Sequence, residues 1–286
     1  MAAIGAMGTE MALDQILGPE ASPSRGRRRP RFRTWRLVVM LIAGAYFLAP
    51  IYAGLKFALQ NDAGHFSFFA VKALPTEPGF GAAFWLSIRL SFVTVVLSMI
   101  LMVPTTIYVH LRLPKVRRVV EFITILPIVI PPIILITRVL GSYPLWLKSS
   151  PYLLSLMYVI LAMPFVYRSL DAGLSAIDLK TLVEASRSLG GSMFATMRRV
   201  ILPNLRAALL SAMVLTLALV LGEFTMASLD LWETIPVWIV NFQQSDGHVT
   251  VAASMLGLIG SWVLLTLIVS LDRSQSRRSL RKTGGV

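Results

Sequence analysis

Residues 184–203 read EASRSLGGSMFATMRRVILP, and the interpretation of the whole chain starts from this stretch. It lies between two strongly apolar stretches and mixes charged, small and apolar residues. A chain with 56% hydrophobic residues has few places where it can contact a water-soluble partner. This is the longest internal segment able to form an amphipathic surface outside lipid, so we expect it to carry such a contact.

The composition is that of an integral membrane protein. Only 14% of the 286 residues are charged, and the mean hydropathy of +0.72 lies well to the apolar side of soluble domains. The absence of cysteine excludes disulfides, thiolate metal sites and a cysteine nucleophile. His65, His110 and His248 lie far apart, with no i, i+4 pair that would suggest a metal site.

Six apolar stretches are long enough to cross a bilayer. A helix needs roughly 20 mostly apolar residues, because each residue rises about 1.5 Å and the hydrocarbon core is about 30 Å thick. Backbone polar groups cannot stay unpaired in lipid, so these stretches must be helical. We therefore predict an all-α membrane protein with a transmembrane domain over 35–272. The expected spans are 35–59, 83–110, 119–140, 152–170, 205–229 and 249–271.

Basic residues are concentrated on one side of these spans. They occupy an arm before the first span, the links after the second and fourth spans, and a tail at 273–286. Lys and Arg are retained on the cytoplasmic side, so both termini are predicted to be cytoplasmic. The same placement explains the net charge of +13 without nucleic acid. Residues 1–34, rich in Gly, Pro, Ser and Arg, are predicted to be a disordered basic arm.

Prolines at membrane depth predict kinked or locally unwound helices. Pro50, Pro104 and Pro164 lie within apolar stretches, and the sequence LPIVIPP at 126–132 is the densest case. An interior proline removes one helical hydrogen bond and clashes with the preceding turn. We interpret these distortions as packing geometry, with a gating hinge as the alternative.

The segment 171–204 is predicted to form two short helices on the cytoplasmic side. Asp178 can cap the first helix, Gly190 and Gly191 provide a break, and Ser192 can cap a second helix that ends before Pro203. Charged residues should flank a discontinuous apolar surface on these helices. An amphipathic helix lying at the lipid headgroups is the alternative. The apolar residues are Leu182, Val183, Leu189, Met193, Phe194 and Met197, and the charged ones are Glu184, Arg187, Arg198 and Arg199.

The spacing within this segment resembles the EAA loop of permease subunits of binding-protein-dependent type I ABC importers. The family pattern is Glu-Ala-Ala, three residues, Gly, nine residues, Ile, one residue, Leu-Pro. Glu184, Ala185 and Gly190 match it, as do Leu202 and Pro203, whereas Ser186 and Val200 replace Ala and Ile. The span order from about residue 83 to 271 also resembles the permease domain.

The resemblance implies a coupling helix that docks on a dimer of cytoplasmic ATPase subunits. Glu184 would then make a polar or ionic contact, Ala185 and Ser186 would permit close approach, and Gly190 would provide the turn. Met193 and Phe194 would be apolar anchors. No Gly-x-x-x-x-Gly-Lys-Ser/Thr motif is present, so the chain is expected to be no enzyme and to hold no cofactor. ATP and Mg would be used by the partner.

The resemblance also implies the remaining partners and the location. These are a second permease subunit, an extracytoplasmic solute-binding protein and the lipid of a bacterial cytoplasmic membrane. The sequence Gly-Glu-Phe around Glu223 resembles the subgroup that serves polyamines, ferric ion, sulfate, molybdate and thiamine. Residues 227–239 are similar to the spermidine/putrescine permeases, which implies a polyamine and a heterodimer.

Glu223 has two interpretations. A carboxylate in the fifth span costs a few kcal/mol, on the order of 3, so it should face a partner helix or an aqueous cavity. It could therefore contact the solute on the translocation pathway or be structural, pairing with the other permease subunit. An ion-coupled secondary transporter is the first alternative class. It would need intramembrane acids or histidines as proton or sodium sites, for which only Glu223 and Glu121 qualify, and no inverted repeat is present. A membrane enzyme would need an acid/base or metal cluster, which the sequence does not contain.

Overall fold

The computed structural model describes residues 34–61 and 63–283. The predicted disordered arm therefore lies outside the described residues, except for Thr34, which begins the first described helix. The chain divides into two compact units, Met1–Pro50 and Ile51–Val286, and each is considered by itself. Helix α2 (Thr34–Ala58) belongs to the first unit up to Pro50 and to the second from Ile51.

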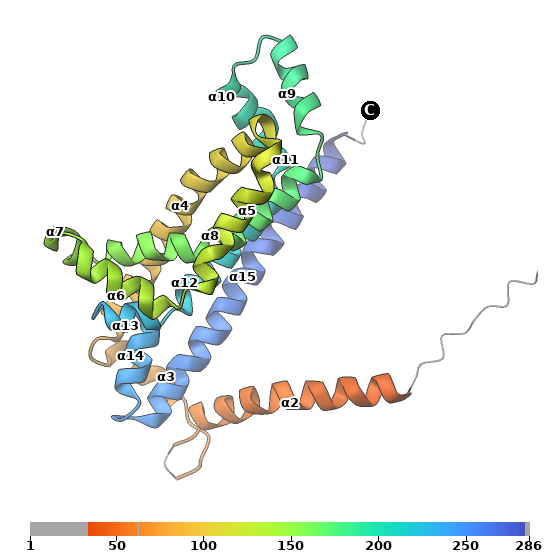
Figure 1. Cartoon of the computed structure of the whole chain (residues 1–286). Helices are drawn as coiled ribbons and strands as arrows, with labels where there is room; N and C mark the ends of the chain where they lie inside the picture. Colours follow the sequence, from red (N-terminus) through yellow and green to blue (C-terminus); the bar gives the residue numbers. More distant parts are fainter. Residues whose placement is uncertain (1–33, 62, 284–286) are drawn as a thin grey trace, which may run out of the picture. The chain divides into compact units, whose positions relative to one another are not determined.

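The described residues form helices and contain no β-strand, which confirms the predicted all-α class (Figure 1). Four helices are each long and apolar enough to cross a membrane, and two bent helix pairs raise the number to as many as six. The long helices are α2, α4 (Phe80–Arg112), α5 (Arg117–Val129), α6 (Pro132–Ser142), α8 (Tyr152–Ser175), α12 (Arg206–Leu221) and α15 (Gly247–Thr283). We refer to residues 178–204, which are predicted to couple the chain to an ATPase, as the coupling segment. The short elements outside it are α3 (Phe69–Ala73), η1 (Leu74–Thr76), η2 (Pro114–Val116), α7 (Leu145–Lys148), α13 (Thr225–Leu229) and α14 (Ile235–Phe242).

Helices α4, α8 and α12 pack together as the centre of the second unit. Small residues allow close approach: a Cβ added at Gly173 of α8 would lie only 2.4 Å from the Cβ of Ala208 on α12. Small hydroxyl residues of α4 are buried at the same centre, and across the α4–α8 contact Ser155 Oγ donates to the carbonyl of Leu90 (3.4 Å). Lipid supplies no hydrophobic driving force between helices, so their association depends on close packing. The small side chains of α4, α8 and α12 permit that packing here.

The predicted span 119–140 is broken in two. Helices α5 and α6 meet at an angle of 91° around Ile130 and Pro131. Pro131 and Pro132 cannot donate backbone hydrogen bonds, so the helix cannot continue through them. This is the kink that the proline-rich run predicted. Pro50, Pro104 and Pro164 instead lie within continuous helices.

The predicted span 205–229 also needs correction, because α12 ends at Leu221 and α13 is a separate helix. The break at 222–224 contains Glu223. At the other end of the chain, α15 runs on to Thr283, through most of the predicted basic tail.

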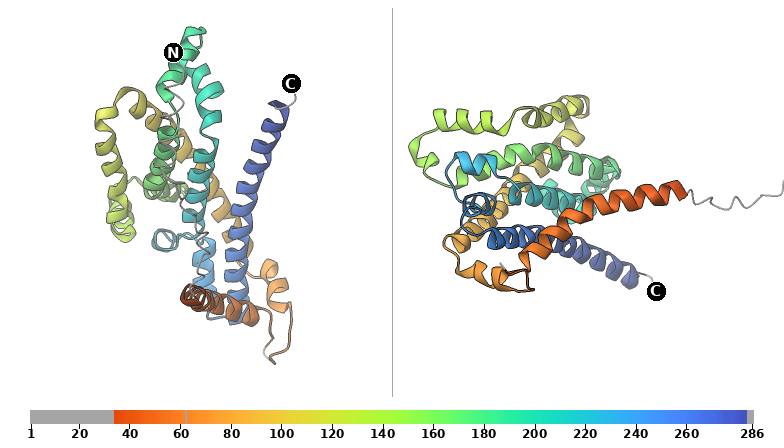
Figure 2. Two further views of the ribbon diagram at one scale, coloured as in Figure 1. Left: turned by 90° about the vertical axis from the view of Figure 1, so that its right-hand side faces the viewer. Right: turned by 90° about the horizontal axis from the view of Figure 1, so that it is seen from below.

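The segment between α8 and α12 extends from one end of the helix bundle. It comprises α9 (Leu179–Ser188), α10 (Met193–Thr196), the π-helical turn η3 (Met197–Ile201) and α11 (Leu202–Asn204). Helices α9 and α10 lie at the top of the view in Figure 1, whereas α13 and α14 lie toward the other end, and the left view of Figure 2 agrees. The C-terminal part of α15 reaches the same end as α9. This arrangement fits a coupling segment and C-terminus on one side of the membrane.

Candidate functional site: the segment between α8 and α12

Helix α9 begins at a side-chain cap. Asp178 Oδ1 accepts a hydrogen bond from the backbone N–H of Thr181 (3.2 Å), and Oδ2 accepts one from the Thr181 hydroxyl (2.7 Å). These bonds, the side-chain bond first, hold the pKa of Asp178 below its usual value, because they stabilise the charged carboxylate. Asp178 is therefore the N-cap that the sequence predicted.

The end of α9 is a Schellman motif built on two glycines. Gly190 has a φ of +78°, and its N–H donates to the carbonyl of Arg187 (2.9 Å). The N–H of Gly191 donates to the carbonyl of Ser186 (2.9 Å). A Cβ at Gly191 would lie 2.6 Å from Ser186 Oγ, so this position needs glycine for space, whereas Gly190 needs it for the left-handed backbone.

The second helix differs from the prediction at its far end. Ser192 caps it as expected, since its hydroxyl accepts a hydrogen bond from the N–H of Ala195 (3.2 Å). The helical path then continues through η3 into α11, so it does not end before Pro203. Pro203 lies within this continuous path, directly after the π-helical turn η3, and its missing N–H removes one hydrogen bond from the path.

The inner face of the segment is anchored in the main core. Leu179 and Val183 of α9 are buried together with Ile201 of η3, in a cluster that includes Tyr167 and Leu170 of α8. Residues of α4 and α12 complete this cluster. Val183 was predicted to lie on the discontinuous apolar surface of these helices, and at 8% exposed it belongs to the part of that surface that packs into the core. Leu182 and Met197 are likewise half-buried.

The outer face presents an apolar tip, which we define as Leu189 and Phe194. Their exposed fractions are 90% and 74%, and Met193 beside them is 38% exposed. Glu184 and Ala185 are exposed on α9. A large aromatic and a leucine held in water are unfavourable in isolation and mark an interaction surface when they sit on a protruding segment.

A contact between two hydroxyls joins α9 to α10, and the sequence analysis missed it. Ser186 Oγ lies 2.8 Å from Thr196 Oγ1, and Thr196 Oγ1 also donates to the carbonyl of Ser192 (2.9 Å). Thr196 is fully buried. Ser186 was expected only to permit close approach, but its hydroxyl gives Thr196 a polar partner. The replacement of the family's Ala by Ser was the available signal.

An ion pair fixes the start of α5 to the end of α8, directly before the segment. Arg117 Nε donates to Asp171 Oδ1 (2.6 Å), and a terminal guanidinium nitrogen of Arg117 donates to Oδ2 and to Ser175 Oγ. His110 Nε2 of α4 lies 3.2 Å from Asp171 Oδ1, without hydrogen-bonding geometry. Two parallel bonds to one carboxylate restrict orientation more strongly than a single contact. The ion pair therefore joins the start of α5 to the end of α8.

Glu223 lies far from this segment and acts as a helix cap. Its Oε1 accepts from the N–H of Met226 (2.9 Å), and its Oε2 accepts from the hydroxyl of Tyr158 (3.0 Å) and the N–H of Ala227 (3.3 Å). Both carboxylate oxygens of Glu223 therefore accept hydrogen bonds, from backbone N–H groups of α13 and from a side chain of α8. These contacts give Glu223 a structural role within this chain, whereas its pairing with a second permease subunit and its place on the translocation pathway stay predictions.

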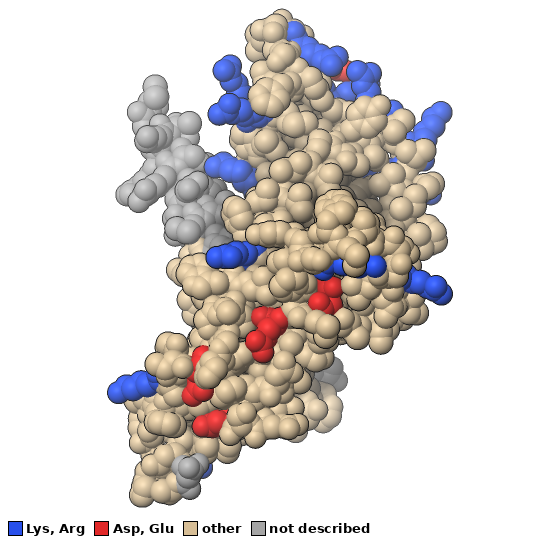
Figure 3. Space-filling view, turned by 90° about the vertical axis from the view of Figure 1, so that its left-hand side faces the viewer, with Lys and Arg blue, Asp and Glu red and all other residues tan. Residues whose placement is uncertain are grey.

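Charge is distributed unevenly along the molecule. On the face shown in Figure 3, Lys and Arg side chains are concentrated in the upper half, toward the end that carries α9 and α10. Most acidic side chains on this face lie in the lower half. This asymmetry is the one expected of a membrane protein whose coupling segment lies on the cytoplasmic side. The orientation of the termini remains a prediction.

Residues 93–281 match the family described as "Binding-protein-dependent transport system inner membrane component". The match covers the central helices, the whole coupling segment and most of α15. The chain belongs to this family. It is thus a permease subunit of an ABC importer, located in the inner membrane. Importers of this kind combine such permeases with ATPase subunits and a solute-binding protein.

Known relatives extend the similarity over most of the permease. It is 29% identical over 258 residues to the "Probable molybdenum ABC transporter permease protein" of Haloferax volcanii, covering 84% of this chain and 93% of the relative. It is 31% identical over 124 residues to a "Probable sulfate transport system permease protein" of Chlorella vulgaris, covering 42% of this chain and 46% of the relative.

A solved structure shares the fold. The permease superposes on a chain from the crystal structure of a bacterial ABC transporter involved in importing the acidic polysaccharide alginate. The TM-score is 0.62, with 16% identity, over 96% of this chain and 99% of the other. At this identity the likeness concerns the fold alone.

Proposed function

We propose that the permease forms the translocation path of an ATP-driven importer and that residues 178–203 couple it to a cytoplasmic ATPase dimer. One observation carries this proposal: the segment combines an exposed apolar tip with a base anchored in the helix core. The tip offers Leu189 and Phe194 to a partner. The base, through Leu179, Val183 and Ile201, belongs to the cluster that holds α4, α8 and α12 together.

This arrangement suits a rigid lever. Movement of a partner bound at the tip would displace α9, and the buried base would pass that displacement to the spanning helices rather than absorb it. The Arg117–Asp171 ion pair adds α5 to the moving unit. Glu184, exposed on α9, is proposed to make the ionic contact, and Met193 to extend the apolar contact. ATP and Mg would be bound by the partner subunits.

A test compares Phe194→Ala with Phe66→Ala in the permease reconstituted with its ATPase subunits. The two phenylalanines have similar exposed fractions, 74% and 70%, but Phe66 lies in the 60–66 loop, away from the coupling segment. Loss of an aromatic anchor at an interface costs about 2 kcal/mol, so Phe194→Ala should weaken ATPase association about thirtyfold. Phe66→Ala should leave association unchanged. Equal affinities for both variants would remove the tip from the interface.

For the solute we propose a small tetrahedral oxyanion, such as molybdate or sulfate, delivered by an extracytoplasmic binding protein. The names of the two relatives support this choice. Two acids predicted to lie in outer loops, Asp230 and Asp246, would suit a cation, but Asp246 caps α15, because its Oδ1 accepts hydrogen bonds from the N–H groups of His248 (2.8 Å) and Val249 (3.0 Å). One carboxylate oxygen of Asp230 is buried without a hydrogen-bond partner in the described part of the chain.

A polyamine remains the second candidate, supported by the resemblance of residues 227–239 to the spermidine/putrescine permeases. Ferric ion and thiamine are further members of the same subgroup. Uptake of labelled molybdate, sulfate and spermidine, each with the binding protein that co-purifies with the complex, separates these solutes. The same preparation shows whether a related second permease is present, as the polyamine resemblance implies, or a second copy of this chain. Uptake driven by a proton gradient without ATP would instead favour a secondary transporter.

A further inference from the structure

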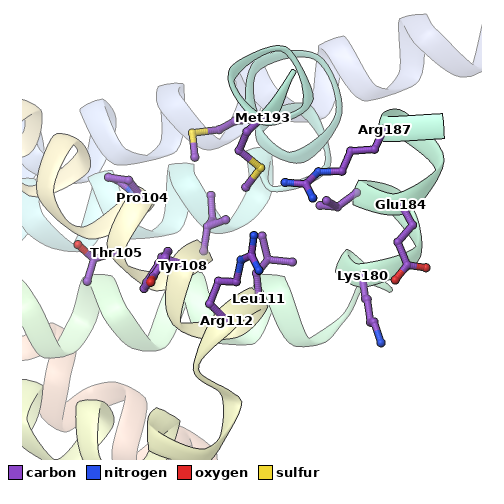
Figure 4. Close-up of a pocket in the computed structure, with 12 residues that line it drawn as sticks. Pro104, Thr105, Tyr108, Leu111, Arg112, Lys180, Glu184, Arg187 and Met193 are labelled. Atoms are coloured by element: carbon purple, nitrogen blue, oxygen red, sulfur yellow. The ribbon is translucent and has the colours of Figure 1, made fainter. Parts of the chain in front are cut away.

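A groove of about 670 Å³ lies between the last turns of α4 and the coupling segment (Figure 4). One wall comes from α4, with Ile107, Tyr108 and Leu111, and the other from α9, α10 and η3. The residues of the apolar tip, Leu189 and Phe194, do not line it. Glu184 and Met193, which are proposed to extend the ATPase contact, do line it, so the groove adjoins the surface proposed to contact the ATPase while the apolar tip lies outside it.

Three cations line the groove beside a single acid. These are Arg112 at the end of α4 and Lys180 and Arg187 on α9, together with Glu184. None of the four forms an ion pair with another residue in the part of the chain that the structure describes. Arg112 and Arg187 both extend into the space between their helices (Figure 4). Two facing guanidinium groups repel each other, and an anion between them would reverse the sign of that interaction.

The rest of the lining is apolar and belongs to a membrane-spanning helix. Helix α4 is 33 residues long and apolar enough to cross the bilayer. Tyr108, one turn before Arg112, is 58% exposed, and Met193 and Met197 add flexible apolar surface opposite it. The groove thus joins an apolar wall, on a helix able to span the membrane, to a cluster of cations at the end of that helix.

We propose that this groove binds an anionic phospholipid. The phosphate lies between Arg112 and Arg187, with Lys180 at its edge, and an acyl chain follows Tyr108 and Leu111 along α4. Basic pockets at the cytoplasmic ends of spanning helices are suited to such headgroups. A water-soluble anion would use the cations but not the apolar wall. The bound lipid connects α4 to α9 at the base of the coupling segment.

The test uses the full-length permease purified in detergent. It is incubated with phosphatidylglycerol or phosphatidylcholine carrying the same acyl chains, and the retained lipid is measured by native mass spectrometry. We expect phosphatidylglycerol to be retained preferentially. The double variant R112Q/R187Q should lower its affinity roughly thirtyfold, about fivefold for each charge. The control R198Q/R199Q removes the same charge from exposed residues of the coupling segment that do not line the groove, and should keep the preference.

Three results would overturn the proposal. Equal loss in both double variants would indicate diffuse charge attraction. Glycerophosphoglycerol has the same headgroup but no acyl chains. If it competed as strongly as the intact lipid, the groove would be a site for free anions. Disulfide cross-linking of two copies through Tyr108→Cys would indicate that a second permease fills the groove. If R112Q/R187Q fails to fold, the single exposed change Lys180→Gln serves in its place, with an expected loss of about fivefold.

Discussion

Replacing Gly190 by alanine should weaken coupling through backbone strain alone. Gly190 adopts a φ of +78°, and a Cβ built there has nothing within 4 Å, so the substitution introduces no clash. An L-residue in the left-handed region costs about 1–2 kcal/mol. The population of the native conformation at the end of α9 would therefore fall roughly 5- to 30-fold relative to relaxed conformations. The affinity for the ATPase would fall by a similar factor.

Gly64 provides a matched control. Its φ is +77°, and it also has nothing within 4 Å of an added Cβ, but it lies in the 60–66 loop. Gly64→Ala and Gly190→Ala should therefore impose similar strain. The assay measures permease–ATPase affinity and the ATP hydrolysis stimulated by the solute-loaded binding protein, in proteoliposomes. Only Gly190→Ala should reduce both.

Two results would refute this reasoning. If Gly64→Ala impaired coupling as much as Gly190→Ala, the effect would come from general destabilisation and not from the coupling segment. If Gly190→Ala left affinity and stimulated hydrolysis unchanged, the Schellman turn would not be needed to present the tip.

Three further predictions concern packing, hydrogen bonding and pH. Gly173→Ala would place a Cβ 2.4 Å from that of Ala208, so we expect it to lower the free energy of unfolding by about 1–3 kcal/mol in thermal unfolding. Adding Ala208→Gly should restore stability. A Gly173→Ala variant as stable as the wild type would contradict the close contact. Ser186→Ala should cost about 0.5–1 kcal/mol, and a double-mutant cycle with Thr196→Val should show coupling, whereas additive effects would rule the contact out. Burial raises the pKa of Asp230 to about 6, above its unfolded value of about 4, so the folded state binds more protons between these values. The free energy of unfolding should fall as pH rises from about 4 to 6. Asp230→Asn should remove much of this pH dependence. An unchanged pH dependence in that variant would exclude Asp230 as its source.

The membrane class and the two capped helices between residues 171 and 204 could be predicted from local features, whereas their coupling role was implied by the resemblance to the EAA loop. Long apolar stretches must be helical in lipid whatever their neighbours are. Asp178 and Ser192 were identifiable as caps, because capping depends on residues within the same turn. The helix-breaking effect of Pro131 is local too, so the break was predictable although its angle of 91° was not.

The direction of each side chain could not be predicted in the same way. Val183 and Phe194 are both apolar residues on short amphipathic helices, yet Val183 is 8% exposed and Phe194 is 74% exposed. Periodicity shows that two faces of a helix differ in polarity. It does not show which apolar residues pack against another helix and which are exposed. The same limit applies to Glu223, whose partner Tyr158 is 65 residues away in the chain.

Hydropathy, caps and glycine spacing act over a few residues, so the sequence alone was enough to predict a helical membrane protein with a polar segment at 171–204, and the resemblance to the EAA loop implied its coupling role. Which part of that segment is anchored and which is exposed depends on the tertiary structure. It also brought Arg112 of α4 beside Arg187 of α9 to form the groove. Such contacts depend on how helices cross, and the crossing is set by packing among residues that are distant in the chain.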